Sequence, residues 1–342
     1  MAAREEKFAE KKKALLLALP RARSLRELAR LSRLSLSTVE RLVDKMKRDG
    51  KFKFVPDDDF FGLARVVAFA PGDAEIKKVP IGTNYVRCFR TYSGPVKVIG
   101  AYVPRALAPN YIADLKKHVE IAGHFTSTEY AAWIPTAETL AEEVDITKLS
   151  ERVLVAGEGR KDEASRGRVP DDVDLKLLVG KLVYGPFIRA AEILIKLSRR
   201  VKIKLLPKQT LSYHYRNHLL PGWRATTYHE YKDEKQVPFV GLYLKGKEAG
   251  KVAKILAMLP YSGVAAIAEN KAFYMGQLKC SLYPQVAELV AVHNAKAPFG
   301  LMYMKLELVS WIPPLWVFVK KEGKKWRWRW HRKSLLVKQR TA

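Results

Sequence analysis

The sequence has few cysteines and no long apolar run. Its two cysteines, Cys88 and Cys280, lie far apart and without CxxC spacing, which argues against a disulfide framework or a thiolate zinc site, so we expect two reduced core thiols. No apolar run approaches the roughly 18 residues of a membrane span. The apolar core of "KKKALLLALPRAR" is short and interrupted by Pro20, unlike a signal peptide. These features predict a cytoplasmic protein without a membrane partner.

Acidic residues are also scarce relative to basic ones. Lys and Arg total 62 against 35 Asp and Glu, a formal net charge of +27. Like charges repel in the compact state, so this excess indicates a polyanionic partner rather than a folding requirement. Nucleic acid is the commonest such partner, with an anionic membrane and an acidic protein surface as the remaining choices. The helix-turn-helix pattern of the residues that follow favours double-stranded DNA, with RNA as the alternative and a nucleoid-associated location. With 342 residues, 48% of them hydrophobic, the chain is long enough for several folded units.

The N-terminal residues carry the pattern of three successive helices. The leucines before Pro20 predict the first helix. Ser24 with Glu27, and Ser37 with Glu40, match the S-x-x-E capping box and predict the starts of the second and third helices. A tight turn between the second and third helices is typical of a helix-turn-helix, whose third helix enters the DNA major groove.

A β-wing is predicted directly after these helices. Gly50 is expected to end the third helix in a left-handed cap. In "KFKFVPDDDFFG", charged and aromatic residues alternate, a Pro-Asp run turns the chain, and the apolar pattern resumes. We therefore predict a winged helix-turn-helix over residues 1–62.

Residues 63–136 are predicted to form a ferredoxin-like βαββαβ sandwich, in which one antiparallel sheet carries two helices on one face. The elements are a strand in "ARVVAFA", a short helix at 74–79, two strands around Ser93-Gly94 in "YVRCFRTYSGPVKVIGAYV", a helix in "NYIADLKKHVEIAG" and a strand in "STEYAAWI".

The same plan is predicted a second time after an acid-rich linker at 137–170. A second helix-turn-helix is expected at 171–236, with helices in "DDVDLKLLVGKL", "GPFIRAAEILIKL" and "TLSYHYRNHL". A second βαββαβ unit is expected at 237–312, and a basic, tryptophan-rich hairpin and tail at 313–342. The predicted fold class is α+β, as a tandem repeat.

This order of elements resembles the Lrp/AsnC family of bacterial and archaeal transcription regulators. The resemblance is carried by "SLRELARLSRLSLSTVERLVDKMKRDGKFKF" followed by "FGLARVVAFA", while "TLSYHYRNHL" is similar to archaeal winged-helix recognition helices. It implies DNA binding by the helix-turn-helix and a small-molecule effector in the βαββαβ domains. Members of that family sense amino acids through a glycine-acidic motif near the third strand of the sandwich. The corresponding hairpins here read "VIGAYVPRA" and "YMGQLKCSL" and do not contain that motif.

Polar and basic side chains on the outward faces of the two third helices are the candidate DNA contacts. Such residues donate to phosphates or pair with purine edges, whereas a charged helix face is otherwise simply solvated. The first set comprises Ser37, Thr38, Arg41, Lys45 and Arg48, with Lys51 and Lys53 from the wing, and the second comprises Lys208, Gln209, Thr210, Tyr213, Arg216 and Asn217. Arg41 is placed for a base edge, with Lys45 and Arg48 for phosphates.

His214 and His218 fall on core positions of the second recognition helix. Their i, i+4 spacing suits a metal, but the sequence around them supplies no evident third ligand, so we expect packed or hydrogen-bonded histidines and no metal.

The C-terminal tail alternates tryptophan and arginine. Lys324, Lys325, Arg327 and Arg329 are candidate phosphate contacts. Its tryptophans are expected either to stack on bases or, as the favoured alternative, to pack an edge hairpin onto the second domain.

The leading function is a DNA-binding transcription regulator with two helix-turn-helix units in the major groove. The alternative is an architectural or RNA- or ribosome-associated protein with little sequence preference. Since the sequence lacks P-loop, GxGxxG, GxSxG and HExxH motifs, we expect no enzyme activity and no cofactor.

Overall fold

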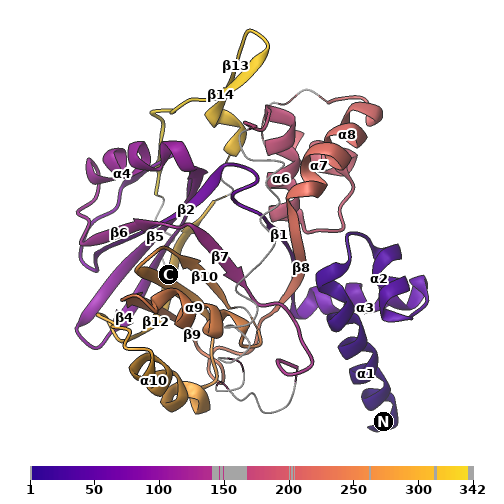
Figure 1. The fold of residues 1–342 in the computed structure, drawn as a ribbon, viewed down its shortest axis with the longest axis horizontal. Helices are drawn as coiled ribbons and strands as arrows, with labels where there is room; N and C mark the ends of the chain where they lie inside the picture. The colour runs from indigo at the N-terminus through magenta and orange to yellow at the C-terminus, as the bar shows by residue number, and fades with distance from the viewer. Residues whose placement is uncertain are drawn as a thin grey trace.

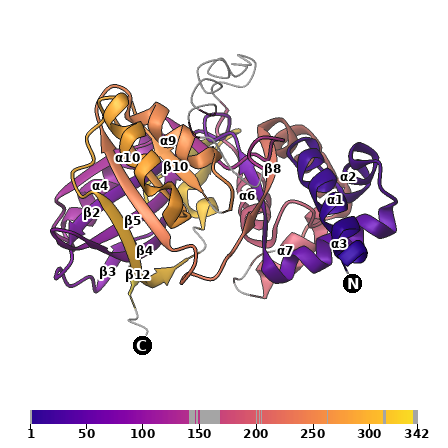
Figure 2. The same ribbon diagram turned by 90° about the horizontal axis from the view of Figure 1, so that it is seen from below.

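The computed structural model describes residues 2–140, 146, 149, 168–199, 201, 203, 205–261, 263–311 and 314–337. It shows an α+β protein in which one curled antiparallel sheet carries two groups of helices on one side (Figures 1 and 2). Most of the predicted acidic linker lies outside the described residues. None of the described helices is long and apolar enough to cross a membrane. Both cysteines are free, but Cys280 is exposed and Cys88 half-buried, so the prediction of two core thiols was wrong.

The sheet has nine strands in two halves that meet where β4 pairs with β12. The pairs are antiparallel throughout the described register. Across the sheet the order is β6 (Gly123–Thr126), β2 (Leu63–Pro71), β5 (Gly94–Pro104), β4 (Thr83–Thr91), β12 (Leu301–Ser310), β9 (Phe239–Lys245), β11 (Lys271–Gln277), β10 (Val264–Ile267) and β7 (Glu129–Ala132).

The sheet curls until its two halves face each other across an apolar layer. Phe69 of β2 contacts Tyr243 of β9, with ring centroids 4.3 Å apart. The sheet edges meet at the β6–β7 connection, where the Ser127 N–H donates to the Arg65 carbonyl in β2. The next N–H in the chain donates to the carbonyl of Ile267 in β10. β6 and β7 are the two end strands of the sheet, and the short connection between them therefore joins its two edges.

The second half has every element predicted for it. The order is β9, α9 (Ala249–Met258), β10, β11, α10 (Tyr283–Val292) and β12, with the predicted turn between β10 and β11. The apolar face of α9 is buried on β10 and β11.

The first half departs from its prediction in two places. Residues 74–79 form no helix: β3 (Lys78–Pro80) pairs with β15 (Ser334–Leu336) near the C-terminus. The final strand is β6 rather than "STEYAAWI", because β7 crosses to the opposite edge and pairs with β10. The predicted strands β2, β4 and β5 and the helix α4 (Ala108–Lys116) are present.

The C-terminal segment covers the face that the missing helix would cover. Leu315 and Phe318 of η7 (Leu315–Phe318) are fully buried in the same core as β4 and β5. Trp330 stacks on Phe318 with centroids 5.7 Å apart, and its indole N–H donates to Asp114 of α4 at 2.7 Å. Trp328, in the hairpin of β13 (Val319–Glu322) and β14 (Lys325–Trp328), lies beside Gly62. These indoles therefore pack on the first half, not on the predicted second domain.

The first helical group contains α1 (Ala2–Ala18), η1 (Leu19–Arg21), α2 (Leu25–Ser32) and α3 (Leu36–Asp49). Ser24 caps α2 as predicted, since its hydroxyl accepts the Glu27 N–H at 3.1 Å. Helix α3 begins earlier than predicted. Ser35 is its cap and accepts from the Thr38 N–H, because the left-handed Arg33 (φ 56°) ends α2 and lets the chain turn sooner.

The predicted wing hairpin is replaced by a ribbon of two distant strands. β1 (Gly50–Pro56) pairs along its length with β8 (Trp223–Glu230), which the sequence analysis did not identify. Gly50 is extended (φ −178°), not a left-handed cap, and runs straight from α3 into β1. A side chain there would collide with the His229 carbonyl at 2.2 Å and the Tyr228 ring at 2.7 Å. Close approach of β8 therefore requires the glycine.

The ribbon's two faces hold different parts of the molecule. On one face, the Phe52 ring packs on Tyr228 at 4.9 Å and on Phe187 at 5.7 Å. The Tyr228 hydroxyl donates to the Met46 carbonyl of α3 at 2.7 Å. On the other face, the hydroxyl of Thr227 donates to a main-chain carbonyl of the segment after β7. The ribbon thus joins the helical groups to each other and to the sheet (Figure 1).

The second helical group contains α6 (Asp172–Tyr184), α7 (Ala190–Ser198) and α8 (Lys208–His214), which continues as one π turn (Tyr215–Leu219) and η5 (Leu220–Gly222). The three predicted helices are present, and Asp171 caps α6 in a full capping box. Helix α6 packs on β1 and on η7, so this group shares a core with the first half of the sheet.

The ribbon contains a buried histidine, His229, that makes the folded protein sensitive to acid. Burial and then the charge of Lys53 lower the pKa of His229 from 6.5 to about 3, and its Nε2 is buried without a partner. The unfolded chain binds a proton in this window and the folded chain does not, so stability falls as pH falls from 6.5 toward 3.

We expect His229→Leu to reduce this acid sensitivity. Between about pH 6.5 and pH 4.5 the variant should lose ~2–3 kcal/mol less free energy of unfolding than the wild type. Urea denaturation at both pH values measures the difference. His118→Leu, at an exposed position, is the control and should keep the wild-type slope. Equal slopes for all three proteins would contradict the assignment.

Candidate nucleic-acid interface

Helix α3 presents a polar face opposite a buried one. Val39, Leu42, Val43 and Met46 are buried, each at most 4% exposed. The predicted contacts lie on the opposite side: Ser37, Arg41, Lys45 and Arg48 are exposed and Thr38 is half-buried. The structure therefore brings the predicted residues of this helix together on one open surface.

Further cations border this surface. Arg26, Arg30 and Arg33 of the α2 region are exposed. Lys45 lies over the Phe8 ring of α1, with its ammonium 3.6 Å from the centroid, so this side chain has an intramolecular aromatic partner. Lys47 pairs with Asp44 at 2.8 Å.

The two predicted wing residues differ in environment. Both lie on the face of β1 opposite Phe52, where Lys51 is exposed and Lys53 is half-buried. Burial, and then the charges of Lys51 and Arg87, lower the pKa of Lys53 to about 8. Lys53 therefore does not share the open surface on which the prediction placed it.

Helix α8 presents a second polar surface. Lys208, Gln209, Tyr213, Arg216 and Asn217 are exposed, and Thr210 is half-buried. Leu211 faces the core at 3% exposure. As predicted, His214 and His218 point inward, with side chains 13% and 14% exposed.

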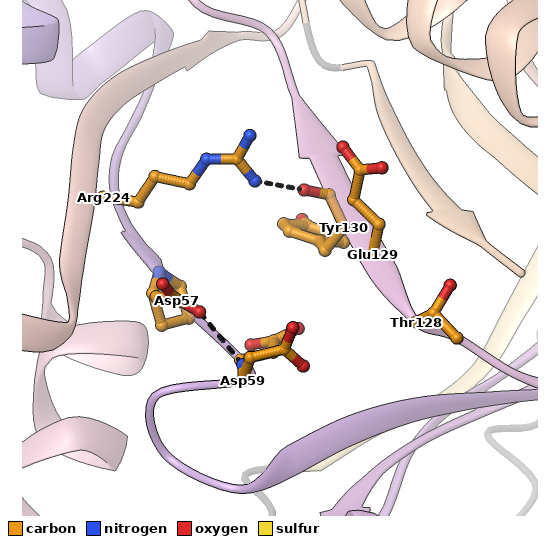
Figure 3. Close-up of a pocket in the computed structure, with 8 residues that line it drawn as sticks. Asp57, Asp59, Thr128, Glu129, Tyr130 and Arg224 are labelled. Atoms are coloured by element: carbon orange, nitrogen blue, oxygen red, sulfur yellow. Dashed lines mark hydrogen bonds between the residues drawn. The ribbon is translucent and has the colours of Figure 1, made fainter. Parts of the chain in front are cut away.

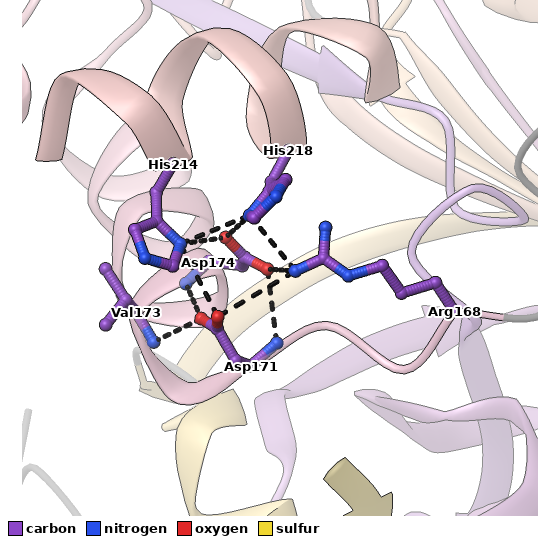
Figure 4. A network of polar contacts seen from close by, with 6 residues as sticks. All are labelled: Arg168, Asp171, Val173, Asp174, His214 and His218. Atoms are coloured by element: carbon purple, nitrogen blue, oxygen red, sulfur yellow. Dashed lines mark hydrogen bonds and ion pairs between the residues drawn. The ribbon is translucent and has the colours of Figure 1, made fainter. Parts of the chain in front are cut away.

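The inward histidines meet two carboxylates that the sequence analysis did not connect with them. His214 Nδ1 lies 2.8 Å, and His218 Nδ1 3.0 Å, from Asp174 Oδ1 (Figure 4). Asp171 Oδ2 lies 3.5 Å from His214 Nδ1. Arg168 donates to the other oxygen of Asp174 at 2.8 Å. The expectation that these histidines lack further ligand groups was therefore wrong.

The reason for the miss is sequence distance. "DDVD" is recognisable as a helix cap, but its free oxygens reach the histidines only because α6 and α8 pack together. Burial raises the pKa of Asp171, and the neighbouring Asp174 carboxylate adds to this, although the Asp174 N–H and the charges of His214 and Arg168 oppose it.

The four predicted basic residues of the tail, Lys324, Lys325, Arg327 and Arg329, are all exposed on the β13–β14 hairpin. Arg327 lies 3.5 Å from Glu322 across the hairpin. The hairpin projects from the sheet above the second helical group, away from α3 (Figure 1).

A pocket lies where the end of β1 meets β7. Its lining is Pro56, Asp57, Asp58, Asp59, Thr128, Glu129, Tyr130 and Arg224 (Figure 3). It is thus separate from the hairpins in which the family resemblance would place an effector.

The acidic groups of this pocket already have partners. Asp57 accepts the Asp59 and Phe60 N–H groups, and Asp59 also pairs with Arg105. Asp58 pairs with an arginine of β2, and Glu129 with a lysine of α9 at 2.7 Å. Arg224 donates to the Tyr130 carbonyl at 3.2 Å. The pocket is a polar joint between the ribbon and the sheet.

No protein-family model, curated protein or solved structure matches this chain.

Proposed function

We propose that this protein is a DNA-binding transcription regulator that reads two major-groove segments with helices α3 and α8. The observation that supports it best is the polar, cationic surface of α3, whose opposite face is fully packed. A helix held by its apolar face with basic residues outward is the arrangement that helix-turn-helix proteins place in the major groove.

The proposal includes a duplicated plan, in which each copy joins a three-helix group to one strand of the ribbon and to one half of the sheet. In both copies three helices precede a strand of the ribbon, and each half of the sheet follows. The ribbon acts as a shared wing. Two readers joined in this way would contact half-sites about one helical turn, ~34 Å, apart.

Charge supports a polyanionic target for both surfaces. The net charge of +27 raises the local concentration of phosphate-bearing partners and speeds association. In the first group the exposed cations of α2 and α3 outnumber the exposed acids. Positions close to the start of a recognition helix contact base edges, which favours Arg41, whereas the hairpin lysines suit phosphates.

We expect Arg41→Ala to reduce affinity for a selected DNA site more than affinity for random DNA. The loss of a base contact corresponds to ~1–3 kcal/mol of discrimination. Lys324→Ala should weaken both affinities alike, since a phosphate contact is independent of sequence. Selection of bound DNA from a random pool, followed by titration at fixed salt, measures both. Lys247→Ala, an exposed lysine before α9, is the control. Equal losses at selected and random DNA for Arg41→Ala would refute the assigned role.

A second candidate is an architectural or RNA-associated protein. Exposed lysines and arginines also occur on the tail hairpin, outside the faces of both recognition helices, which suits binding through charge alone. The ratio of specific to non-specific affinity separates the two: a regulator should reach ~10³ or more, and an architectural protein a value close to unity. Adding RNA as a competitor in the same titration tests whether the protein binds RNA in preference to DNA.

A further inference from the structure

Four side-chain atoms from two helical segments converge between α6 and α8. They are Oδ2 of Asp171, Oδ1 of Asp174, and Nδ1 of His214 and His218, and ligand atoms of these four residues all lie within 4.8 Å of one another. The two histidine nitrogens are 3.2 Å apart. Ligands bonded to one tetrahedral zinc ion at about 2.0–2.1 Å lie about 3.3 Å from each other. The spacing between these atoms is therefore close to that of a four-ligand site.

The helix cap leaves one oxygen of each carboxylate available. Oδ1 of Asp171 accepts the N–H groups of Val173 and Asp174, both at 2.9 Å. Oδ2 of Asp174 accepts the Asp171 N–H at 3.2 Å and the Arg168 guanidinium. These contacts fix the carboxylates, and their remaining oxygens point at the histidines (Figure 4). Metal ligands in proteins are oriented by outer hydrogen bonds of this kind.

Hydrogen bonding alone does not satisfy the cluster. His218 Nδ1 lies 3.0 Å from Asp174 Oδ1, which can only accept, and 3.0 Å from Arg168 Nη2, which can only donate. A protonated Nδ1 can donate to the aspartate but then faces a second donor in the arginine. An unprotonated Nδ1 can accept from the arginine but then faces a second acceptor in the aspartate. A cation between the four atoms would accept both histidine lone pairs and the two facing carboxylate oxygens together, and Arg168 would then donate to Oδ2 of Asp174 alone.

We propose that Asp171, Asp174, His214 and His218 bind a divalent metal ion of the zinc class. Two imidazole nitrogens and two carboxylate oxygens form a donor set that suits Zn²⁺. Four protein ligands fill a tetrahedral shell, so the site is structural rather than catalytic. The groups are mostly buried, with Asp174 only 2% exposed. The ion would link the start of α6 to the end of α8 and to its π turn.

If α8 reads DNA, which rests on the proposed function, the ion also orients the reading surface. His214 and His218 lie on the same short helix as Tyr213, Arg216 and Asn217. Fixing the histidines to α6 fixes the direction of these outward residues. Removal of the ion should then weaken binding to a selected site, whereas metal uptake itself needs no nucleic acid.

The test measures Zn²⁺ uptake by the full-length chain after treatment with a chelator, without nucleic acid. We expect one equivalent per chain and a rise in melting temperature when Zn²⁺ is added, because a ligand that binds only the folded state stabilises it. His218→Gln should weaken uptake by at least ~100-fold, more than the loss typical of an outer-shell change. Co²⁺ in place of Zn²⁺ should give the visible absorption of a tetrahedral site.

Two controls separate a metal site from an ion-pair cluster. His118→Gln, at an exposed histidine, should keep full uptake. Arg168→Gln removes the side chain that neutralises Asp174 without removing a ligand. Added Zn²⁺ should therefore raise its melting temperature at least as much as that of the wild type. The proposal is overturned if the stripped wild type takes up no Zn²⁺, or if His218→Gln binds it as tightly as the wild type. If the wild type takes up Zn²⁺ normally but does not bind DNA, only the proposed function is contradicted.

Discussion

Asp58→Ala is expected to lower the free energy of unfolding by ~3–5 kcal/mol, as removal of one partner of a buried ion pair does. Asp58 accepts from Arg65 at 3.0 Å and from the Tyr102 hydroxyl at 2.5 Å. Burial alone would lower the pKa of Arg65, but the attraction and hydrogen bond of Asp58, together with the nearby Tyr130 and Tyr102, raise the pKa above its usual value. The guanidinium also lies over the Tyr130 ring of β7, 3.4 Å from its centroid. Without Asp58 this buried charge has no counter-ion among the described contacts.

Denaturant titration of this variant is best compared with Asp59→Ala. Asp59 pairs with Arg105 on the surface, where the side chains are 63% and 42% exposed, and such pairs contribute ~0–1 kcal/mol. The double variant Asp58→Leu with Arg65→Met should recover much of the loss, because no unpaired charge remains. Similar losses for Asp58→Ala and Asp59→Ala would show that the buried pair is not the cause.

Tyr228→Ala is expected to cost a further ~3–5 kcal/mol by a different mechanism, the loss of a large buried ring. Tyr228 is fully buried among the residues of the first helical group, although it lies in β8. Its ring packs on Phe52 and its hydroxyl donates to the Met46 carbonyl. Removing the ring should therefore loosen α3 from the ribbon as well as lower overall stability.

Thermal melts and hydrogen exchange at α3 amides measure this effect. Tyr228→Phe keeps the ring and should lose only ~1 kcal/mol, the contribution of one hydrogen bond. Tyr92→Ala, at a fully exposed tyrosine in the β4–β5 turn, should remain within ~0.5 kcal/mol of the wild type. If exchange at α3 in Tyr228→Ala matches the wild type, β8 does not hold the first helical group.

Sequence periodicity was sufficient for most elements of the fold. The second half of the sheet matches its prediction because each strand and helix there has an uninterrupted apolar pattern and a recognisable turn. Residues 74–79 misled because Ile76 and Val79 suit a helix locally, whereas Leu315 and Phe318 already cover that face of the sheet. The replacement of a predicted helix by a segment far along the chain cannot be recognised from the sequence of residues 74–79. The predicted wing hairpin was wrong for a similar reason, since the sequence of β1 does not show which strand pairs with it.

The candidate surfaces were predicted better than the chemistry beneath them. Helical periodicity separates inward from outward positions, so the exposed faces of α3 and α8 follow from the sequence. Lys53 was misplaced because the ribbon's second face packs toward the sheet, a contact that depends on β8. The convergence of Asp171 and Asp174 with His214 and His218 depends on how α6 packs on α8. Residues forty positions apart give no spacing rule for it.

The ribbon also sets an order of events during synthesis. Helices α1 to α3 emerge from the ribosome long before β8, which begins at Trp223, about 170 residues after β1. At about 5–20 residues per second, this delay lasts roughly 10–30 s. During this delay Phe52 and the apolar side of α3 cannot pack on Tyr228, so the nascent N-terminal segment exposes apolar surface. Slow translation of the intervening residues or a shortage of chaperones is therefore expected to lower the yield of folded protein.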